Sequence, residues 1–248
     1  MKNHEKLKIF LIKKHIDFSC KRVYSIYSLV NGCDSVKTLK RNLDDIVYET
    51  ICDGFVGGQY IAGKRLDPAE LAERYQVSQT PVIQALKRLV HEHICEISQG
   101  GKYMIPVATE EEIQEVCIAR LLFEEDAVVK LCDTITTEDL DFLALQEEKC
   151  EKLYRQGKSD EYFKADMALH KMLVKLAGNH YLYNLYRMLN NKYMIIRATT
   201  GTSLQHNEAA VREHKELLEA LRKHSKKDAR RLIRNHIVKM KKRINGQE

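Results

Sequence analysis

Helix-start and helix-stop signals alternate along the second half of the chain, and they constrain its fold more than any other feature. Thr109 precedes three glutamates, a pattern that predicts a capping box at a helix start. Further caps are predicted at Thr136, Ser159, Asn179 and Ser225, and stops at Gly157 and Gly178. These signals predict helices over residues 110–132, 137–156, 160–177, 180–198, 207–224 and 226–244. We therefore expect residues 110–248 to form an all-helical bundle.

Residues 42–107 show a different order of elements. An apolar helical face (Leu43, Ile46, Val47 and Ile51) ends near residues 54–58, and Asp67 with Pro68 predicts the start of a second helix. Ser78 is expected to cap a third helix that ends near His91. Two short β-type runs then flank residues 99–102, which have the composition of a hairpin turn. This order is typical of a winged helix-turn-helix, so the expected fold class is mainly α with a small β-wing.

The positive charge lies almost entirely in the first 41 residues. Residues 1–41 hold 10 basic and 3 acidic side chains, net +7, whereas residues 42–109 hold 6 and 9, net −3. We expect residues 1–41 to form a basic leader that is flexible or weakly helical. The alternative is a basic arm that contacts the DNA backbone or a partner. Charge alone does not identify a DNA-binding protein here.

Seven cysteines, an odd number without a CxxC pair, favour free thiols in a reducing cytoplasm over disulfides or a thiolate zinc site. No apolar run approaches the roughly 18 residues of a membrane span, and the N-terminus lacks the features of a secretion signal. A cytoplasmic protein that does not contact a membrane is expected.

Three histidines and one carboxylate have a spacing typical of a metal site inside a helical bundle. Asp166 and His170 lie four residues apart, on one face of the expected helix 160–177. His214 and His236 lie equally far from the predicted break at Ser225, so an antiparallel hairpin would place their imidazoles side by side. Nitrogen and oxygen ligands of this kind suit a divalent transition metal, with zinc preferred and nickel, cobalt, iron or manganese as alternatives.

Two sets of motifs show a resemblance to a known family. The first half carries LDDIVYETICDGF and RLDPAELAERYQVSQTPVIQALKRL, followed by the wing. The second half carries ARLLFEEDAVVKL, DMALHKMLVKLAGN and HKELLEALRKHSKKDARRLIRNHI. With these motifs the chain resembles, over about residues 42–243, the GntR-type bacterial transcription regulators with an FCD ligand-binding domain of the FadR/VanR-like branch.

The resemblance implies a role for several residues. Asp166, His170, His214 and His236 are implied to be the metal ligands, and Arg120 and Asn179 to lie near an effector pocket. Arg120 has an alternative role as an ion-pair partner of Glu124 on its own helix. The family also implies that residues 110–248 bind the effector and the metal and mediate dimerisation. The resulting homodimer is implied to bind a palindromic double-stranded operator, and to be released or engaged by a small carboxylate-bearing metabolite.

The chain departs from the family where DNA is usually read, because Gln79 and Ile83 replace arginines of the family pattern. An arginine–guanine pair contributes about 1–3 kcal/mol of discrimination, against a typical specific-over-nonspecific gap of about 4–10 kcal/mol. Gln79 can read adenine and Ile83 can contact a thymine methyl group, so we expect DNA binding that is retained but shifted toward A·T. The remaining candidate DNA contacts are Lys64, Arg65, Ser78, Thr80, Lys87, Arg88 and Lys102.

The leading hypothesis is a metabolite-responsive transcription regulator, with repression as its expected mode, and not an enzyme. Two alternatives stay open. A metal-dependent hydrolase would use the same site, but no HExxH, phosphate loop or nucleophile elbow supports it. A DNA-incompetent partner of a related regulator would explain Gln79, Ile83 and the net charge of −3.

Overall fold

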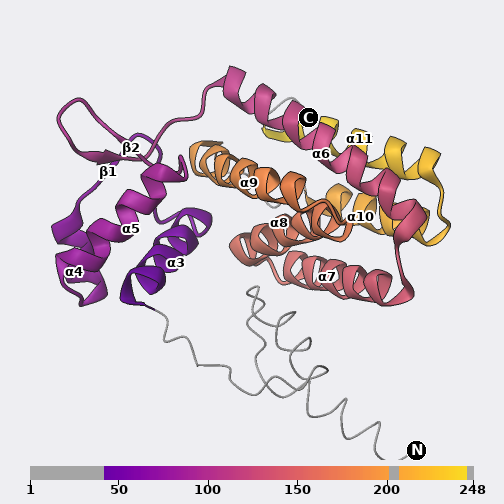
Figure 1. The fold of residues 1–248 in the computed structure, drawn as a ribbon, viewed down its shortest axis with the longest axis horizontal. Helices are drawn as coiled ribbons and strands as arrows, with labels where there is room; N and C mark the ends of the chain where they lie inside the picture. The colour runs from indigo at the N-terminus through magenta and orange to yellow at the C-terminus, as the bar shows by residue number, and fades with distance from the viewer. Residues whose placement is uncertain (1–41, 201–206, 245–248) are drawn as a thin grey trace, which may run out of the picture. The chain divides into compact units, whose positions relative to one another are not determined.

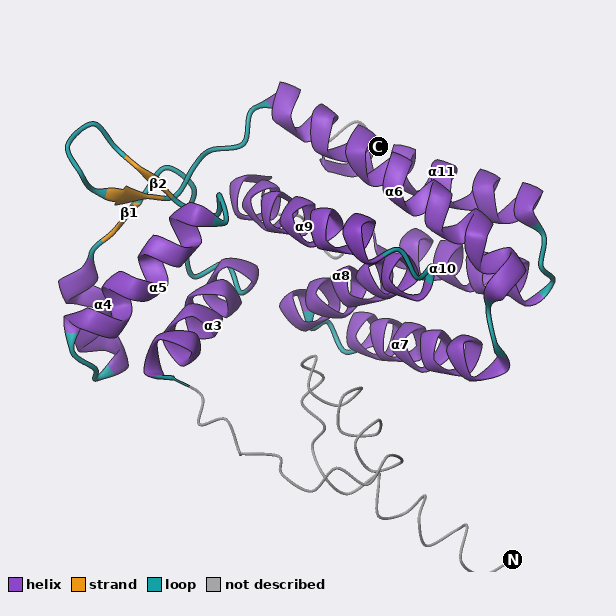
Figure 2. Ribbon diagram, viewed as in Figure 1, coloured by secondary structure: helices purple, strands orange, loops and turns teal. Residues whose placement is uncertain are grey.

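The computed structural model describes residues 42–200 and 207–244, and the expected leader lies outside them. Within the described residues the chain forms nine helices and one small sheet (Figures 1 and 2). The mainly helical fold class is confirmed.

The first part of the described chain has the order of a winged helix-turn-helix. Its elements are α3 (Leu43–Val56), β1 (Arg65–Leu66), α4 (Pro68–Tyr75), α5 (Gln79–His91), β2 (Glu96–Ile97) and β3 (Tyr103–Met104). The strands are antiparallel in the order β1-β3-β2, and Met104 pairs with both Arg65 and Glu96. Strand β1 was not predicted, because two residues are too few to show an alternating pattern.

Local sequence explains how the helices of this part begin and what they bury. The Asp67 side chain accepts hydrogen bonds from the N–H groups of Ala69 and Glu70, as expected of a cap at the start of α4. Ser78 occupies the cap position of α5, but its side chain makes no capping bond. Helix α5 buries Val82, Ala85, Leu86 and Leu89, which hold it in the core.

The apolar face expected on α3 is only partly buried. Val47, Ile51 and Phe55, spaced four residues apart, are buried, whereas Leu43 and Ile46 are about half exposed. Leu43 belongs to the first turn of α3, and Ile46 lies beside the buried stripe rather than on it.

The rest of the described chain is helical, with each boundary within two residues of the prediction. The helices are α6 (Glu110–Thr134), α7 (Thr137–Arg155), α8 (Ser159–Leu176), α9 (His180–Thr200), α10 (Asn207–Arg222) and α11 (Lys226–Ile244). Thr109 and Thr136 both form capping boxes. Gly157 and Gly178 adopt the left-handed conformation that ends a helix at low cost, as predicted.

One predicted cap is wrong. Lys158, not Ser159, is the residue before α8, and Ser159 is the first helical residue. The Ser159 hydroxyl instead accepts a hydrogen bond from Arg197 on α9. A contact with a distant helix therefore replaces the local capping bond that the sequence favoured.

The packing of the last helices brings distant parts of the sequence together. Helix α11 packs against both α6 and α10, and α8 packs against α6, α7 and α9 (Figure 1). The turn between α10 and α11 contains Ser225, whose hydroxyl oxygen accepts a bond from the N–H of Asp228. The two last helices thus form the antiparallel hairpin on which the histidine prediction depended.

Candidate metal centre

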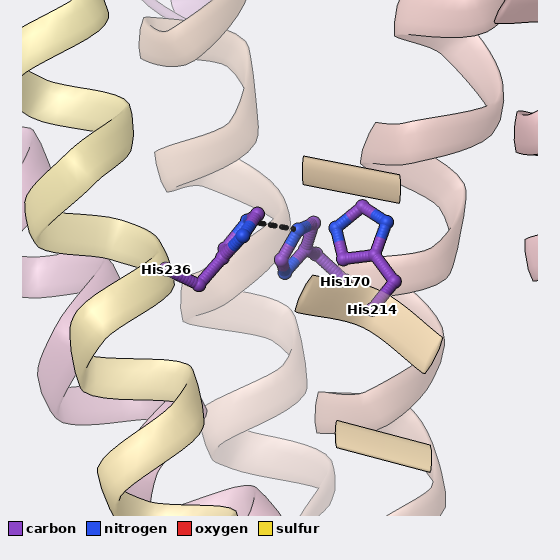
Figure 3. Close-up of side chains that lie close together, drawn as sticks. All are labelled: His170, His214 and His236. Carbon is purple, nitrogen blue, oxygen red and sulfur yellow. Dashed lines mark hydrogen bonds between the residues drawn. The ribbon is translucent and has the colours of Figure 1, made fainter. Parts of the chain in front are cut away.

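Three helices of the bundle bring the predicted ligands into one buried place. Helix α8 carries Asp166 and His170, α10 carries His214, and α11 carries His236. Figure 3 shows the three histidines. Their exposed fractions are only 8%, 1%, 1% and 5%, in that order. Four polar side chains therefore converge inside the bundle.

The α10–α11 hairpin places its two histidines at one level, as their equal distance from Ser225 predicted. The ring centroids of His214 and His236 are 4.7 Å apart. The ring of His170, which comes from a third helix, lies 5.2 Å from that of His214 and 4.9 Å from that of His236. The three rings form one cluster (Figure 3).

The distances between the candidate ligand atoms fit a single metal ion. The Nε2 atoms of His170 and His236 are 3.2 Å apart, and Asp166 Oδ1 lies 3.5 Å from His214 Nε2. Asp166 Oδ1 is 4.0 Å from His170 Nε2, and one nitrogen of each histidine lies within 4.8 Å of the others. Two ligands bound about 2.1 Å from a tetrahedral zinc ion are roughly 3.4 Å apart, which matches the shorter of these distances.

Two glutamates hold two of the imidazole rings from the outside. Glu124 Oε2 lies 2.6 Å from His170 Nδ1, and Glu213 Oε2 lies 2.8 Å from His236 Nδ1. An ionised carboxylate only accepts hydrogen bonds, so we assign the ring hydrogen to Nδ1 in both histidines. The Nε2 lone pairs of both rings then face each other at 3.2 Å, an arrangement that a cation between them stabilises.

The sequence analysis did not assign these carboxylates to the site. Glu213 directly precedes His214 but contacts His236, across the hairpin. Glu124 was considered only as a partner of Arg120. The general tendency of metal-bound histidines to donate their second N–H to a carboxylate is a signal that could have prompted a search for such partners.

Glu124 is the centre of a fully buried polar network. It accepts hydrogen bonds from Arg120 Nε at 2.8 Å, from the Tyr186 hydroxyl at 2.6 Å and from His170. Burial by itself raises the pKa of Glu124, but Arg120, His170 and Tyr186 together outweigh burial and hold the pKa well below its usual range. Glu124 is therefore an anion that orients His170.

The His236 imidazole is predominantly neutral at neutral pH. Burial lowers the pKa of His236, and the bond to Glu213 only partly opposes this. A neutral imidazole is the form that binds metals.

The two predicted effector residues lie in different surroundings. Arg120 is buried and forms the ion pair with Glu124 that the sequence analysis kept as its alternative role. Asn179 is exposed, and its side chain accepts a hydrogen bond from the N–H of Leu182 in the first turn of α9. The structure thus places Arg120, but not Asn179, within the buried network. Their role toward an effector stays a prediction.

The predicted DNA contacts lie mainly on exposed parts of the winged helix. Gln79 and Thr80 are exposed in the first turn of α5, and Ile83 is half-buried one turn later. Ser78, Lys64, Arg65, Lys87 and Lys102 are also exposed. Arg65 pairs with Asp67, whereas Lys102 lies in the turn between β2 and β3.

Arg88 differs from the other predicted DNA contacts because it has several internal partners. Its guanidinium lies 3.0 Å from Glu92 and 3.1 Å from Asp45, and it stacks over the ring of Tyr48. These contacts hold the side chain of Arg88, which lies on α5, against α3. We therefore expect a smaller contribution to DNA binding from Arg88 than from Lys87.

Two further features of the described residues concern thiols and membranes. Cys52, Cys95, Cys117, Cys132 and Cys150 are free, whereas Cys20 and Cys33 lie outside the described residues. None of the described helices combines the length and the apolar character that crossing a bilayer requires.

Comparison with known proteins identifies a family domain in each half of the chain. Residues 43–104 match the bacterial regulatory proteins of the gntR family, and residues 115–239 match the FCD domain. The HTH-type transcriptional regulator YdhC of Bacillus subtilis (strain 168), described as uncharacterized, is 26% identical over 72% of this chain and 80% of its own length. The HTH-type transcriptional repressor NanR of Enterobacter sp. (strain 638) is 22% identical over 80% of this chain and 84% of its own.

A solved structure shows the same fold. McbR/YncC of E. coli superposes with a TM-score of 0.75 at 19% identity, over 83% of this chain and 98% of that one. These relatives and domains are those of transcription regulators rather than enzymes, as the sequence predicted. The chain is a GntR-family transcription regulator that carries an FCD domain.

Proposed function

We propose that this regulator is a repressor whose residues 110–248 hold a divalent transition metal and bind a small organic acid at it. Residues 42–107 bind a palindromic operator, and two copies of the chain bind together. The observation that carries this proposal is the buried convergence of Asp166, His170, His214 and His236, with two rings already oriented by carboxylates.

The donor set suits such an ion. Three neutral imidazoles and one carboxylate bring a single negative charge, so a divalent ion bound among them keeps a net positive charge. When bound, the ion supplies a cationic centre that attracts the carboxylate of a small acid. The protein orients two of the four ligands, His170 and His236, through Glu124 and Glu213, and all four lie in the buried core.

Two considerations support repression by a dimer. The relative from Enterobacter is named as a repressor. A recognition helix reads only one half-site, so a palindromic operator requires two copies of α5 related by a twofold axis. Binding of an acid then changes operator affinity only to the extent that the acid binds the DNA-bound and DNA-free states of the protein with different affinities.

The exposed start of α5 is the surface proposed to read DNA. Gln79 can form two hydrogen bonds with adenine, and Ile83 can pack on a thymine methyl group. The exposed lysines Lys64, Lys87 and Lys102 are proposed to bind phosphates, which fixes the position of α5 but does not select sequence. The expected operator is therefore richer in A·T pairs than one read by arginines.

A second candidate function follows from the same two residues. If the loss of arginine at Gln79 and Ile83 ended specific reading, the chain would modulate a related regulator by pairing with it. The winged helix would then be retained because its buried face is needed for folding.

Selection of genomic DNA separates the two candidates. Metal-loaded protein is incubated with sheared DNA from its own source near physiological salt, and the retained fragments are sequenced. Enrichment of a palindromic, A·T-rich site supports the repressor. Retention that lacks sequence preference and vanishes as salt rises indicates phosphate contact alone and supports the second candidate.

A further inference from the structure

Two strong hydrogen-bond donors in the bundle point at a weak acceptor. The Nη1 atom of Arg120 and the hydroxyl of Tyr193 both lie 3.1 Å from the sulfur of Met240. The Arg120 guanidinium also lies over the Tyr193 ring, at 4.5 Å from its centroid. All three side chains are buried. A cation and a phenol thus converge on a thioether inside the core.

A thioether is a poor partner for such donors. Sulfur accepts hydrogen bonds weakly, whereas a carboxylate oxygen accepts them strongly from arginine and tyrosine. Methionine is also the most adaptable of the large apolar side chains, since it has three rotatable bonds and no branch. The position of the Met240 sulfur is therefore one that an oxygen anion can occupy more favourably.

This position is close to the proposed metal centre along two helices. Met240 follows His236 by four residues on α11, so the two residues share a helix face, with their Cβ atoms about 5–6 Å apart. Arg120 precedes Glu124 by four residues on α6, and Glu124 binds His170. Arg120 therefore lies one helical turn from the carboxylate that binds His170, and Met240 lies one turn from His236.

The electrostatics of Asp166 agree with this closeness. Burial raises the pKa of Tyr193, Arg120 opposes the increase, and the Asp166 carboxylate adds to it. Burial by itself lowers the pKa of Arg120, but Glu124 and the neighbouring tyrosines, together with Asp166, raise it well above its ordinary value. Asp166, a predicted metal ligand, is thus electrostatically coupled to both donors.

We propose that Arg120 and Tyr193 form a carboxylate subsite beside the metal centre, which Met240 fills until a dicarboxylic acid displaces its sulfur. One carboxylate of the acid lies at the centre held by Asp166 and the histidines, and the second accepts hydrogen bonds from Arg120 and Tyr193. This inference rests on the proposed function and narrows the ligand from a small acid to a short dicarboxylic acid. Tyr193 and Met240 are the residues that select it.

Succinate and butyrate test the subsite because both have four carbons and only succinate has the second carboxylate. Binding of each acid to zinc-loaded full-length protein is measured by calorimetry. We expect succinate to bind at least about tenfold more tightly, as hydrogen bonds to a charged group in a buried site predict. Tyr193→Phe removes one donor without changing any charge, and should reduce the preference about tenfold. Tyr154→Phe, on α7, is the matched control and should leave the preference unchanged.

Met240→Leu tests the displacement step at nearly constant side-chain volume. It removes the competing acceptor, so succinate should bind at least as tightly as to the wild type while butyrate binding is unchanged. In protein labelled with ¹³C at the methionine methyl groups, the Met240 signal, assigned by its loss in Met240→Leu, should shift with succinate and stay in place with butyrate. Met194→Leu serves as the control for a methionine change elsewhere in the core.

Equal affinities of the wild type for the two acids would contradict the subsite, and so would an undiminished preference for succinate in folded Tyr193→Phe. Neither result would contradict the metal centre. Weaker succinate binding by Met240→Leu, or a Met240 signal that does not shift with succinate, would contradict the displacement of the Met240 sulfur. Failure of zinc-loaded protein to bind either acid, or failure to retain zinc, would count against the proposed function itself.

Discussion

His170 and His236 face each other through their Nε2 atoms at 3.2 Å, while the Nδ1 atom of each ring binds a buried carboxylate. The two rings come from α8 and α11, which are 66 residues apart in sequence at these positions. Because both Nδ1 atoms already donate to carboxylates, both Nε2 atoms present lone pairs to one point. Asp166 and His214 complete the surroundings of that point.

Loss of one histidine should abolish metal binding. His214→Ala removes one of three imidazoles, so protein purified without chelator should lose its stoichiometric metal, measured by mass spectrometry of the metal content. Chelator should lower the melting temperature of the wild type, since metal bound only by the folded state stabilises it, and should not change that of His214→Ala.

His180→Ala is the matched control, because His180 is exposed at the start of α9. It should keep both the metal and the response to chelator. A wild-type protein that carries no metal, or a His214→Ala variant that keeps all of it, would contradict the assignment of the ligands.

Glu213 should tune metal affinity without contacting the metal. Glu213→Gln keeps the shape of the side chain but weakens the acceptor that orients His236, so metal affinity should fall about 10–100-fold. Competition with a chromophoric chelator measures this change. Glu216→Gln, exposed on the same helix, should leave the affinity unchanged. An equal affinity of the two variants would show that Glu213 does not position His236.

The convergence of the four candidate ligands could be predicted from sequence because it depends on local periodicity. Asp166 and His170 share a helix face, and the positions of His214 and His236 follow from a symmetric hairpin about Ser225. Glu124 and Glu213 were missed as partners because their bonds cross between helices, where spacing along the chain says nothing about distance. The same reason explains Ser159, whose hydroxyl binds Arg197 on another helix rather than capping its own.

The fold followed from the same kind of signal. Capping boxes at Thr109 and Thr136 and the left-handed Gly157 and Gly178 are local features, so the boundaries of the helices were predictable. Strand β1 was not, because it exists only through its pairing with β3. Tertiary contacts therefore determine the elements that local sequence patterns cannot predict.

The buried ion pair between Arg120 and Glu124 should be needed for stability. Arg120→Ala leaves the Glu124 carboxylate buried without its main cationic partner, which is expected to reduce the free energy of unfolding by about 3–5 kcal/mol. Urea denaturation followed by circular dichroism measures the change. Arg155→Ala removes an exposed arginine that pairs with Glu151, and should cost less than about 1 kcal/mol. Similar costs for the two variants would mean that the buried network contributes little.

The thiol of Cys95 should be unreactive in the folded protein. Burial raises the pKa of Cys95 to about 12, from an ordinary value of 9.0, so the thiolate is about a thousandfold scarcer at a given pH below both values. Iodoacetamide at pH 8, followed by mass spectrometry of the Cys95 peptide, should show labelling in urea and almost none under native conditions. Rapid labelling of that peptide in native protein would contradict the burial of Cys95.

Restoring arginine at the start of α5 should change which DNA the protein selects. Gln79 is exposed and Ile83 is half-buried, so both replacements can be accommodated without disturbing the core made by Val82, Ala85, Leu86 and Leu89. Gln79→Arg combined with Ile83→Arg should raise affinity and move the selected site from A·T toward G·C, because arginine forms paired hydrogen bonds with guanine. Sequencing of selected DNA at fixed salt measures the preference.

A control must separate sequence reading from added charge. Leu145→Arg combined with Gln156→Arg adds the same two charges at exposed positions on and just after α7, away from the reading helix. It should leave the selected sequence unchanged, although nonspecific binding at low salt can rise with the charge. If the α5 variant selects the same sites as the wild type and binds them no more tightly, then Gln79 and Ile83 do not face the bases, and the proposed interface is wrong.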